Sequence, residues 1–305
     1  MGLSPSLFML IRFLFLLSLF SLILSSVQPL CHDDESFALL QFKESFIFNR
    51  SASYAPSAYS KVSSWMIRSN DCCTWDGVEC DENMGHVISL DINNSFLYGS
   101  INSSSSLFQL VHLQKLNPVY NNFNHSEIPI GVGWLSNLTH LNLSCFGFLG
   151  EIPAEILQLS KLVSLDLYSN PLTLHKLGLN RIAEKLTNLE ELVLSEVDIS
   201  STVPSILANL SSLTAIFLRN CGMHGEFPTR IFQLPNLKSL SVHLNPKLTG
   251  RVPEFNRSSP LEDLNLRAQV SLAIYLIQLV TSNLYTTWML KVAISLVQYH
   301  RQLLT

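Results

Sequence analysis

Three cysteines lie close together in the stretch NDCCTWDGVEC, residues 70–80, and thiols at this spacing allow three kinds of chemistry. Cys72, Cys73 and Cys80 could bind a metal, supply a nucleophile or form disulfides. A zinc site that combined them with His86 would lack the paired CxxC spacing of zinc-binding domains. The compartment in which the chain folds decides between these alternatives, because disulfides persist only in oxidising surroundings.

The N-terminus predicts export from the cell. Residues 1–26 hold an apolar run from Leu7 to Leu24 with one charge at Arg12, and small residues follow at Ser25 and Ser26. This order is typical of a secretory signal peptide, and an uncleaved anchor helix is the alternative because the run approaches the length of a bilayer span. We therefore expect disulfides, since a reactive thiol would be oxidised there, and a location in the secretory pathway and at the cell surface, plasma membrane or outside the cell.

Glycosylation acceptors are frequent along the chain, which agrees with export. Eight Asn-X-Ser/Thr triplets occur, and none has proline in the middle. A density of this kind is typical of an extracellular glycoprotein. The predicted acceptors are Asn49, Asn93, Asn102, Asn124, Asn137, Asn142, Asn209 and Asn256.

Charge and motifs exclude several classes of function. The formal net charge is -4, and no basic run interleaved with aromatic residues occurs, so we do not expect a nucleic acid partner. The sequence contains no HExxH, GxSxG, GxxxxGK[ST] or strand-linked GxGxxG motif and no kinase signature. We therefore predict that the protein is not an enzyme and holds neither a cofactor nor a metal.

A repeat organises the middle of the chain and would position any functional side chains. Eight units follow the pattern LxxLxLxxNxLxGxIP at steps of 24–27 residues, and we call them coils 1 to 8 and number their places from the first apolar residue. Places one, four and six should point into a core, whereas the places between them project outward from a short strand. The units begin at Val87, Leu113, Leu138, Leu162, Leu189, Leu213, Leu237 and Leu261.

The ninth place of each coil has a separate role. Asn121 and Asn170 occupy it in coils 2 and 4, where we expect their amides to bond backbone groups between successive coils. Cys221 takes this place in coil 6 and Phe146 takes it in coil 3. Pro118 stands at the sixth place of coil 2, and its missing N–H should weaken the strand ladder there.

The pattern resembles the leucine-rich repeat, and its GxIP ending is typical of the plant extracellular subtype, as in GEIP at 150–153, GEFP at 225–228 and GRVP at 250–253. The resemblance implies an α/β solenoid, a leucine-rich-repeat horseshoe segment with a disulfide-bonded N-terminal cap. Upstream, the apolar residues Phe37, Leu40, Phe42 and Phe46 fall at roughly helical spacing, which predicts a cap helix. Together DDESFALLQFK, Trp65 and CCTWDGVEC resemble the cap of plant receptor-like proteins and receptor-like kinases.

The family resemblance also implies which cysteines pair. It suggests Cys31 with Cys72 and Cys73 with Cys80, whereas the sequence alone allows three connectivities for four cysteines. Cys145 and Cys221 lie three coils apart and are expected to be free. The predicted organisation is a signal peptide at 1–26, the cap at 27–86, about eight repeats at 87–267 with the last incomplete, and an apolar tail without repeats at 268–305.

The tail departs from the family pattern. Its two apolar runs are separated by the polar residues Thr281, Ser282 and Asn283 and are each short for a membrane span, so a single tilted span around Trp288 is the alternative to a soluble tail. Because complete receptor-like proteins continue with more repeats, we interpret the chain as a truncated or alternatively spliced product.

The outward places of the coils form the concave face, where this architecture usually binds its ligand. The resemblance implies recognition of a protein, peptide or glycan ligand in defence or developmental signalling, with a partner receptor kinase. The alternatives are a secreted enzyme inhibitor similar to polygalacturonase-inhibiting proteins, or a non-functional truncated product. The predicted ligand-binding residues are Tyr120, Tyr168, Glu191, Phe217, Arg219 and His243.

Overall fold

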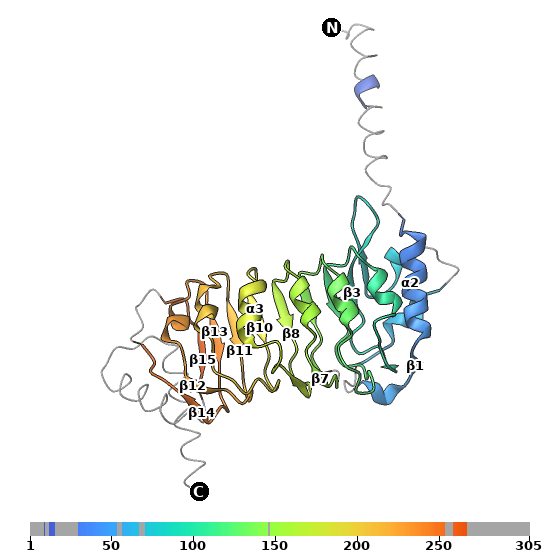
Figure 1. Ribbon diagram of the computed structural model, residues 1–305. Helices are drawn as coiled ribbons and strands as arrows, with labels where there is room; N and C mark the ends of the chain where they lie inside the picture. Colours follow the sequence, from blue (N-terminus) through green and yellow to red (C-terminus); the bar gives the residue numbers. More distant parts are fainter. Residues whose placement is uncertain are drawn as a thin grey trace, which may run out of the picture.

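The computed structural model describes residues 9, 12–15, 30–53, 57–66, 71–145, 147–253 and 259–266. These residues form a curved solenoid, with the cap at one end and the coils following one another along the arc (Figure 1). The predicted signal peptide, apart from residues 9 and 12–15, and the predicted tail lie outside the described residues. No helix within the described ranges combines the length and apolarity that a bilayer span requires.

One long sheet lines the concave side of the solenoid. In the described chain it contains nine strands in the order β15-β13-β11-β10-β8-β6-β5-β3-β2, and all neighbouring pairs are parallel except β2 with β3. Parallel neighbours in chain order require each coil to make a full turn before the next strand begins. The strands are β2 (Val78–Cys80), β3 (Val87–Asp91), β5 (Lys115–Asn117), β6 (His140–Asn142), β8 (Ser164–Asp166), β10 (Glu191–Val193), β11 (Ala215–Phe217), β13 (Ser239–Ser241) and β15 (Asp263–Asn265).

Shorter strands lie along one lateral side of the coils, where the GxIP endings turn the chain back. β1 pairs with β4 antiparallel, whereas β7 with β9 and β12 with β14 pair parallel. Isolated bridges also join lateral residues of neighbouring coils, namely Tyr98 with Asn122, Thr173 with Asp198 and Thr202 with His224. These strands are β1 (Ile47–Phe48), β4 (Leu97–Tyr98), β7 (Gly150–Glu151), β9 (Leu172–Thr173), β12 (His224–Glu226) and β14 (Lys247–Thr249).

Single helical turns cover the side opposite the long sheet. Most are 3-10 turns, and several begin directly after the proline of the GxIP ending. Coil 4 differs, because its spacer is longer and forms the α-helix α3 (Leu179–Lys185) instead. The 3-10 turns are η1 (Arg50–Ala52), η2 (Lys61–Ser64), η3 (Cys72–Thr74), η4 (Ser106–Gln109), η5 (Ile130–Trp134), η6 (Ala154–Gln158), η7 (Ser205–Asn209) and η8 (Thr229–Gln233).

The core follows the repeat pattern. In coil 4 the residues at places one, four and six are Leu162, Leu165 and Leu167, and each is completely buried. Neighbouring strands keep the same places opposite one another, as Leu165 pairs with Leu192 of the next coil. The predicted solenoid fold is confirmed, since a buried leucine stack under a parallel sheet is what the spacing requires.

The cap helix is present but does not bury the predicted face. Helix α2 (Asp33–Glu44) buries Ala38, Leu39 and Phe42, whereas Phe37, one of the apolar residues whose spacing indicated the helix, is 64% exposed. Since positions three and four apart share a face, burial of Leu39 and Phe42 turns Phe37 to solvent. The inward face of the first turn is instead occupied by the carboxylate of Glu35.

Candidate functional site

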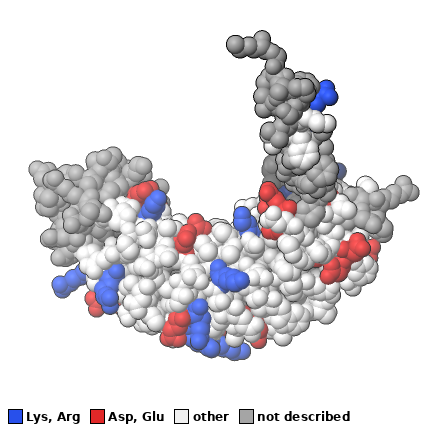
Figure 2. Space-filling model, turned by 90° about the horizontal axis from the view of Figure 1, so that it is seen from above, with Lys and Arg blue, Asp and Glu red and all other residues white. Residues whose placement is uncertain are grey.

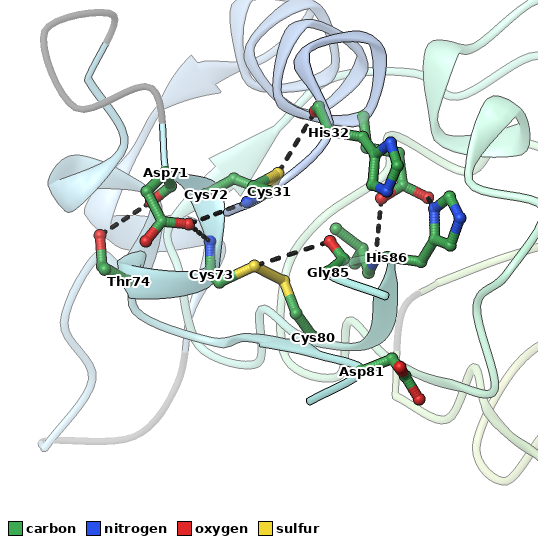
Figure 3. The surroundings of a disulfide bond; sticks show 12 residues. Cys31, His32, Asp71, Cys72, Cys73, Thr74, Cys80, Asp81, Gly85 and His86 are labelled. Atoms are coloured by element: carbon green, nitrogen blue, oxygen red, sulfur yellow. Dashed lines mark hydrogen bonds and ion pairs between the residues drawn. A yellow bond between two sulfur atoms is a disulfide. The ribbon is translucent and has the colours of Figure 1, made fainter. Parts of the chain in front are cut away.

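The cysteines at the cap are held in two disulfides, as the family resemblance implied. Cys31 is bonded to Cys72 and Cys73 to Cys80 (Figure 3). The sulfurs of Cys31, Cys72 and Cys73 lie within 4.8 Å of one another, but all are in disulfides and none is a thiolate ligand for a metal. Asp71 adds to this arrangement by accepting the backbone N–H groups of Cys31 and Cys73 at 3.1 and 3.2 Å. The cluster is therefore structural.

Two tryptophans and a stack of histidines complete the joint between the cap and the first coils. Trp65 and Trp75 are buried and stacked, with ring centroids 5.7 Å apart. The imidazole of His86 lies between those of His32 and His112, at centroid distances of 3.9 and 3.7 Å. This stack of three imidazole rings connects the start of α2 with coils 1 and 2, and it was not predicted from the sequence. Its sequence signal is a histidine directly before the first apolar residue in each of the two coils.

The predicted ligand-binding residues all lie on the concave face. Glu191 and Phe217 stand at outward places of β10 and β11, and Arg219 and His243 follow β11 and β13 by two residues. Tyr120 is 41% exposed, with φ of 57° in the left-handed region that non-glycine residues rarely adopt. Seen from above, acidic and basic side chains alternate along the hollowed side of the arc (Figure 2). The face therefore offers both charges and aromatic rings.

Arg219 is held by an ion pair within this face. Its Nη1 lies 2.6 Å from Oε1 of Glu196, which belongs to the preceding coil, and both side chains are about one third exposed at 34% and 28%. The pair fixes the guanidinium across two coils. A ligand carboxylate would thus meet an arginine whose charge is already partly balanced.

The middle of the face is acidic. Burial, and second the neighbouring Glu191, raise the pKa of the Asp166 carboxyl. Ser164 donates to Oε2 of Glu191 at 3.0 Å, and the N–H of Tyr168 donates to Oδ1 of Asp166 at 2.9 Å. The sequence reading did not single out Asp166, because its burial depends on the coils at either side.

The two remaining cysteines are free of disulfides, as expected. Cys221 is buried, its Sγ donates to the carbonyl of Leu194 at 3.1 Å, and burial raises the pKa of its thiol to about 12. Cys145 is half-buried on the concave face, where burial, and second Asp166, raise its pKa. Repulsion from Cys145 in turn raises the pKa of Tyr120. Neither thiol has the lowered pKa of a reactive cysteine.

The predicted glycosylation acceptors differ in exposure. Asn49, Asn102, Asn124 and Asn209 are exposed, whereas Asn93, Asn137 and Asn142 are half-buried and Asn256 lies outside the described residues. Asn142 is on β6, so a glycan there would stand on the concave face. Glycan occupancy stays a prediction.

Comparison with known proteins identifies the architecture. Residues 32–81 match the model of the leucine rich repeat N-terminal domain. The chain is 39% identical over 262 residues to Receptor-like protein 6 of Arabidopsis thaliana, which covers 79% of this chain and 26% of that protein. Over this part of their length, the chain is similar to the plant leucine-rich-repeat receptor-like proteins. It spans about a quarter to a third of the length of the curated receptor-like proteins it matches.

Solved plant structures share the fold of this receptor-like chain. The crystal structure of a plant ice-binding protein superposes with a TM-score of 0.65 at 26% identity, covering 79% of this chain and 72% of that one. The leucine-rich-repeat ectodomain of the Arabidopsis receptor kinase HAESA, in complex with an IDA peptide hormone, superposes with a TM-score of 0.58 at 25% identity, covering 76% of this chain and 41% of that one. The relatives and the two disulfides confirm the predicted location in the secretory pathway and at the cell surface or outside the cell.

Proposed function

We propose that the chain is an extracellular recognition module that binds a protein or peptide ligand on its concave face and signals through a partner receptor kinase. One observation carries this proposal. The outward places of successive parallel strands lie side by side, so Glu191 of β10 and Phe217 of β11 share one surface, and Tyr168 follows the neighbouring strand β8 by two residues. With strands about 4.8 Å apart, an extended peptide of several residues would contact several coils at once.

The composition of this surface also favours a peptide. Tyrosine and arginine are enriched at the centres of protein interfaces; Tyr168 lies next to Asp166, and Arg219 is paired with Glu196. The HAESA ectodomain, which shares the fold, is bound to a peptide hormone in its solved complex. A glycan ligand would be expected to stack on the same aromatic rings and is an alternative outcome of the test.

We infer that the module has no enzymatic activity of its own and no nucleic acid partner. The two free thiols, Cys145 and Cys221, have raised pKa values, so neither is an activated nucleophile. Nothing in the described structure favours the enzyme-inhibitor alternative over ligand recognition.

Selection from a phage-displayed library of random dodecapeptides tests the proposal. Peptides enriched on the secreted chain should bind with lower affinity, by about tenfold or more, when Tyr168 and Phe217 are changed to alanine. Trp134, which is 56% exposed on η5 away from the strands, provides the control Trp134→Ala, which should leave affinity unchanged. Enriched peptides that depend on Trp134 and not on Tyr168 would refute the concave site. If no peptide is enriched but the chain binds oligosaccharides on a glycan array, the ligand is a glycan and the proposed ligand class is wrong.

A further inference from the structure

Successive coils are joined on the sheet side by two backbone hydrogen bonds. The sixth-place N–H donates to the fifth-place carbonyl of the next coil, and the eighth-place N–H donates to its seventh-place carbonyl. The sixth-place bonds are Ile92 to Asn117 (3.0 Å), Leu143 to Asp166 (2.8 Å), Leu167 to Val193 (2.9 Å), Leu194 to Phe217 (2.9 Å), Leu218 to Ser241 (2.8 Å) and Val242 to Asn265 (3.1 Å). The eighth-place bonds are Asn94 to Val119, Cys145 to Tyr168, Ser169 to Ser195, Glu196 to Arg219 and Asn220 to His243.

Both bonds are missing at the joint between coils 2 and 3. Pro118 stands at the sixth place of coil 2 and has no N–H to give to the carbonyl of Asn142. In the described chain, the N–H of Tyr120 makes no hydrogen bond to the carbonyl of Ser144. Accordingly β5 pairs with β6 over two residue pairs, whereas the joints on either side have three.

The lateral side is weak at the same joint. Coils 1 and 2 are bridged there between Tyr98 and Asn122, and coils 3 and 4 by the pairing of β7 with β9. Within the described residues, coils 2 and 3 share no such bridge and have one lateral backbone bond, from the N–H of Leu149 to the carbonyl of Ser126 at 3.2 Å. At the ninth place the side-chain amides of Asn121 and Asn170 donate to the preceding coil, whereas the sequence of coil 3 has a phenylalanine there, whose side chain carries no donor.

The core is also imperfectly filled at this joint. An apolar cavity of about 20 Å³ lies in the core at coil 2, where residues of the cap and coil 1 line it as well as residues of coils 2 and 3. Its lining includes Leu116, Pro118 and Phe123 from coil 2 and Leu143 and Phe148 from coil 3. A proline ring at the sixth place is smaller than the leucine found there in coils 3, 4, 5 and 6, which accounts for unfilled volume next to Pro118.

Bonds remain on the opposite edge of the joint. The N–H groups of Thr139 and His140 both donate to the carbonyl of Gln114, at 2.8 and 3.0 Å. The two coils are therefore fastened along one edge and loosely joined along the other.

We propose that the joint between coils 2 and 3 is a hinge. The cap with coils 1 and 2 moves as one body and coils 3 onward move as a second, about a pivot at Gln114 and Thr139, and the joint opens on the lateral side. Tyr120 lies on the cap side of the hinge and Tyr168 on the far side, so opening changes the separation of two residues of the ligand-binding face. That consequence rests on the proposed function, whereas the hinge itself does not.

Hydrogen exchange of the secreted chain, resolved to single amides, tests the hinge without any ligand. The lateral amide of Leu149 should exchange at least about tenfold faster than that of Asp198, which makes a lateral bond between coils 4 and 5. The pivot amide of His140 should exchange as slowly as that of Ser164, which occupies the same place one coil later. Slow exchange at Leu149 would overturn the hinge, and fast exchange at both Leu149 and His140 would mean local melting of the whole joint instead.

Substitution of the proline gives a second test. Pro118→Leu supplies the missing N–H and fills the cavity, so the amide of Leu149 should slow to the rate of Asp198. Pro118→Ala supplies the N–H without needing extra room, which keeps the test valid if leucine disrupts folding. The control is Pro235→Leu, an exposed proline at the end of coil 6, which should leave Leu149 unchanged. An unchanged Leu149 rate in both Pro118 variants would refute the role of the proline.

Discussion

The carboxylate of Glu35 accepts the backbone N–H of Val87 at 2.8 Å, and so joins the first turn of the cap helix α2 to the first strand of the repeats, β3. Glu35 is 4% exposed, and its second oxygen lies 3.3 Å from Nδ1 of His86. A carboxylate thus satisfies a backbone donor at the start of β3, the first strand of the repeats, which no coil precedes. The cap is attached to the solenoid by this bond as well as by apolar packing.

Replacing Glu35 by alanine should therefore destabilise the protein. The buried N–H of Val87 would lose its partner, which we expect to lower the free energy of unfolding by about 2 kcal/mol. Glu35→Gln keeps an acceptor and should cost less. The exposed neighbour provides the control Asp34→Ala, and urea unfolding measures all three. Equal stability of Glu35→Ala and Asp34→Ala would show that the bond adds nothing.

The two disulfides should differ in their contributions. Cys31–Cys72 closes a separation of 41 residues and Cys73–Cys80 one of 7. Loop-closure entropy predicts a loss of about 4 kcal/mol for the first and about 2 kcal/mol for the second when each pair is changed to alanine. The yield of secreted protein and the midpoint temperature of thermal unfolding should both fall more when Cys31–Cys72 is removed than when Cys73–Cys80 is removed. Normal secretion and stability with selective loss of ligand binding would contradict a structural role.

The ninth-place ladder gives a prediction with an internal comparison. The buried Asn170 donates to the carbonyls of Leu143 and Leu167 at 2.8 and 3.0 Å, so Asn170→Ala should lower the free energy of unfolding by about 2–3 kcal/mol. Cys221 occupies the equivalent place in coil 6, and Cys221→Asn should raise stability by up to about 1 kcal/mol because an amide donates more strongly than a thiol. Denaturant titration compares them, and a destabilised Cys221→Asn would contradict the equivalence of the two places.

The raised pKa of Asp166 predicts that the free energy of unfolding depends on pH. Its pKa is raised in the folded protein, by burial first and Glu191 second, so the folded state binds the proton more readily than the unfolded state. Protonation of Asp166 therefore stabilises the folded protein at pH values below 3.8, the ordinary pKa of the group. This stabilisation is lost as the pH rises through the raised pKa of the folded state. Asp166→Asn should therefore raise the free energy of unfolding at pH 7, and the gain should shrink as the pH falls toward 3.8.

Unfolding of Asp166→Asn at several pH values measures this effect. The exposed Asp263 on β15 provides the control Asp263→Asn, which should produce a smaller change. A gain that is constant with pH would mean that the charge of Asp166 is not responsible.

Much of the fold could be predicted because the same spacing of apolar residues recurs in every coil, so each coil supports the assignment of the others. A leucine at one place of one coil is a weak signal, but Leu162 recurs as Leu189 and Leu213 at the same place, and only a stacked solenoid buries all of them. The same reasoning placed Asn121 and Asn170 in the ladder, where both are found. The recurrence of the pattern thus indicated which residues pack together in the folded protein, which the sequence of a single helix or strand does not indicate.

The cap has no repetition, and there the sequence was less informative. Both Phe37 and Glu35 fit an amphipathic helix on spacing alone, and hydrophobicity favoured burial of Phe37. The structure buries Glu35 because the N–H of Val87 needs an acceptor, which depends on a partner 52 residues away. Likewise the helix α3 in the spacer of coil 4 was not predicted.

The candidate site could be predicted as a surface but not as a set of interactions. Alternation along each strand placed Tyr168 and Phe217 outward, because this requires only the period of a strand. The ion pair of Arg219 with Glu196 and the raised pKa of Asp166 depend on distances between coils. Such distances are set by packing and are absent from the spacing of residues within one coil.

The central claim is that ligands bind the concave strands. Its most direct test is a hydrogen-exchange footprint on the secreted full chain, with the most enriched library peptide as the probe. We expect protection of amides in β8, β10 and β11 and no protection in the turns η5 and η6 on the opposite side. Protection confined to η5 and η6, with the three strands exchanging as in the free protein, would contradict the account.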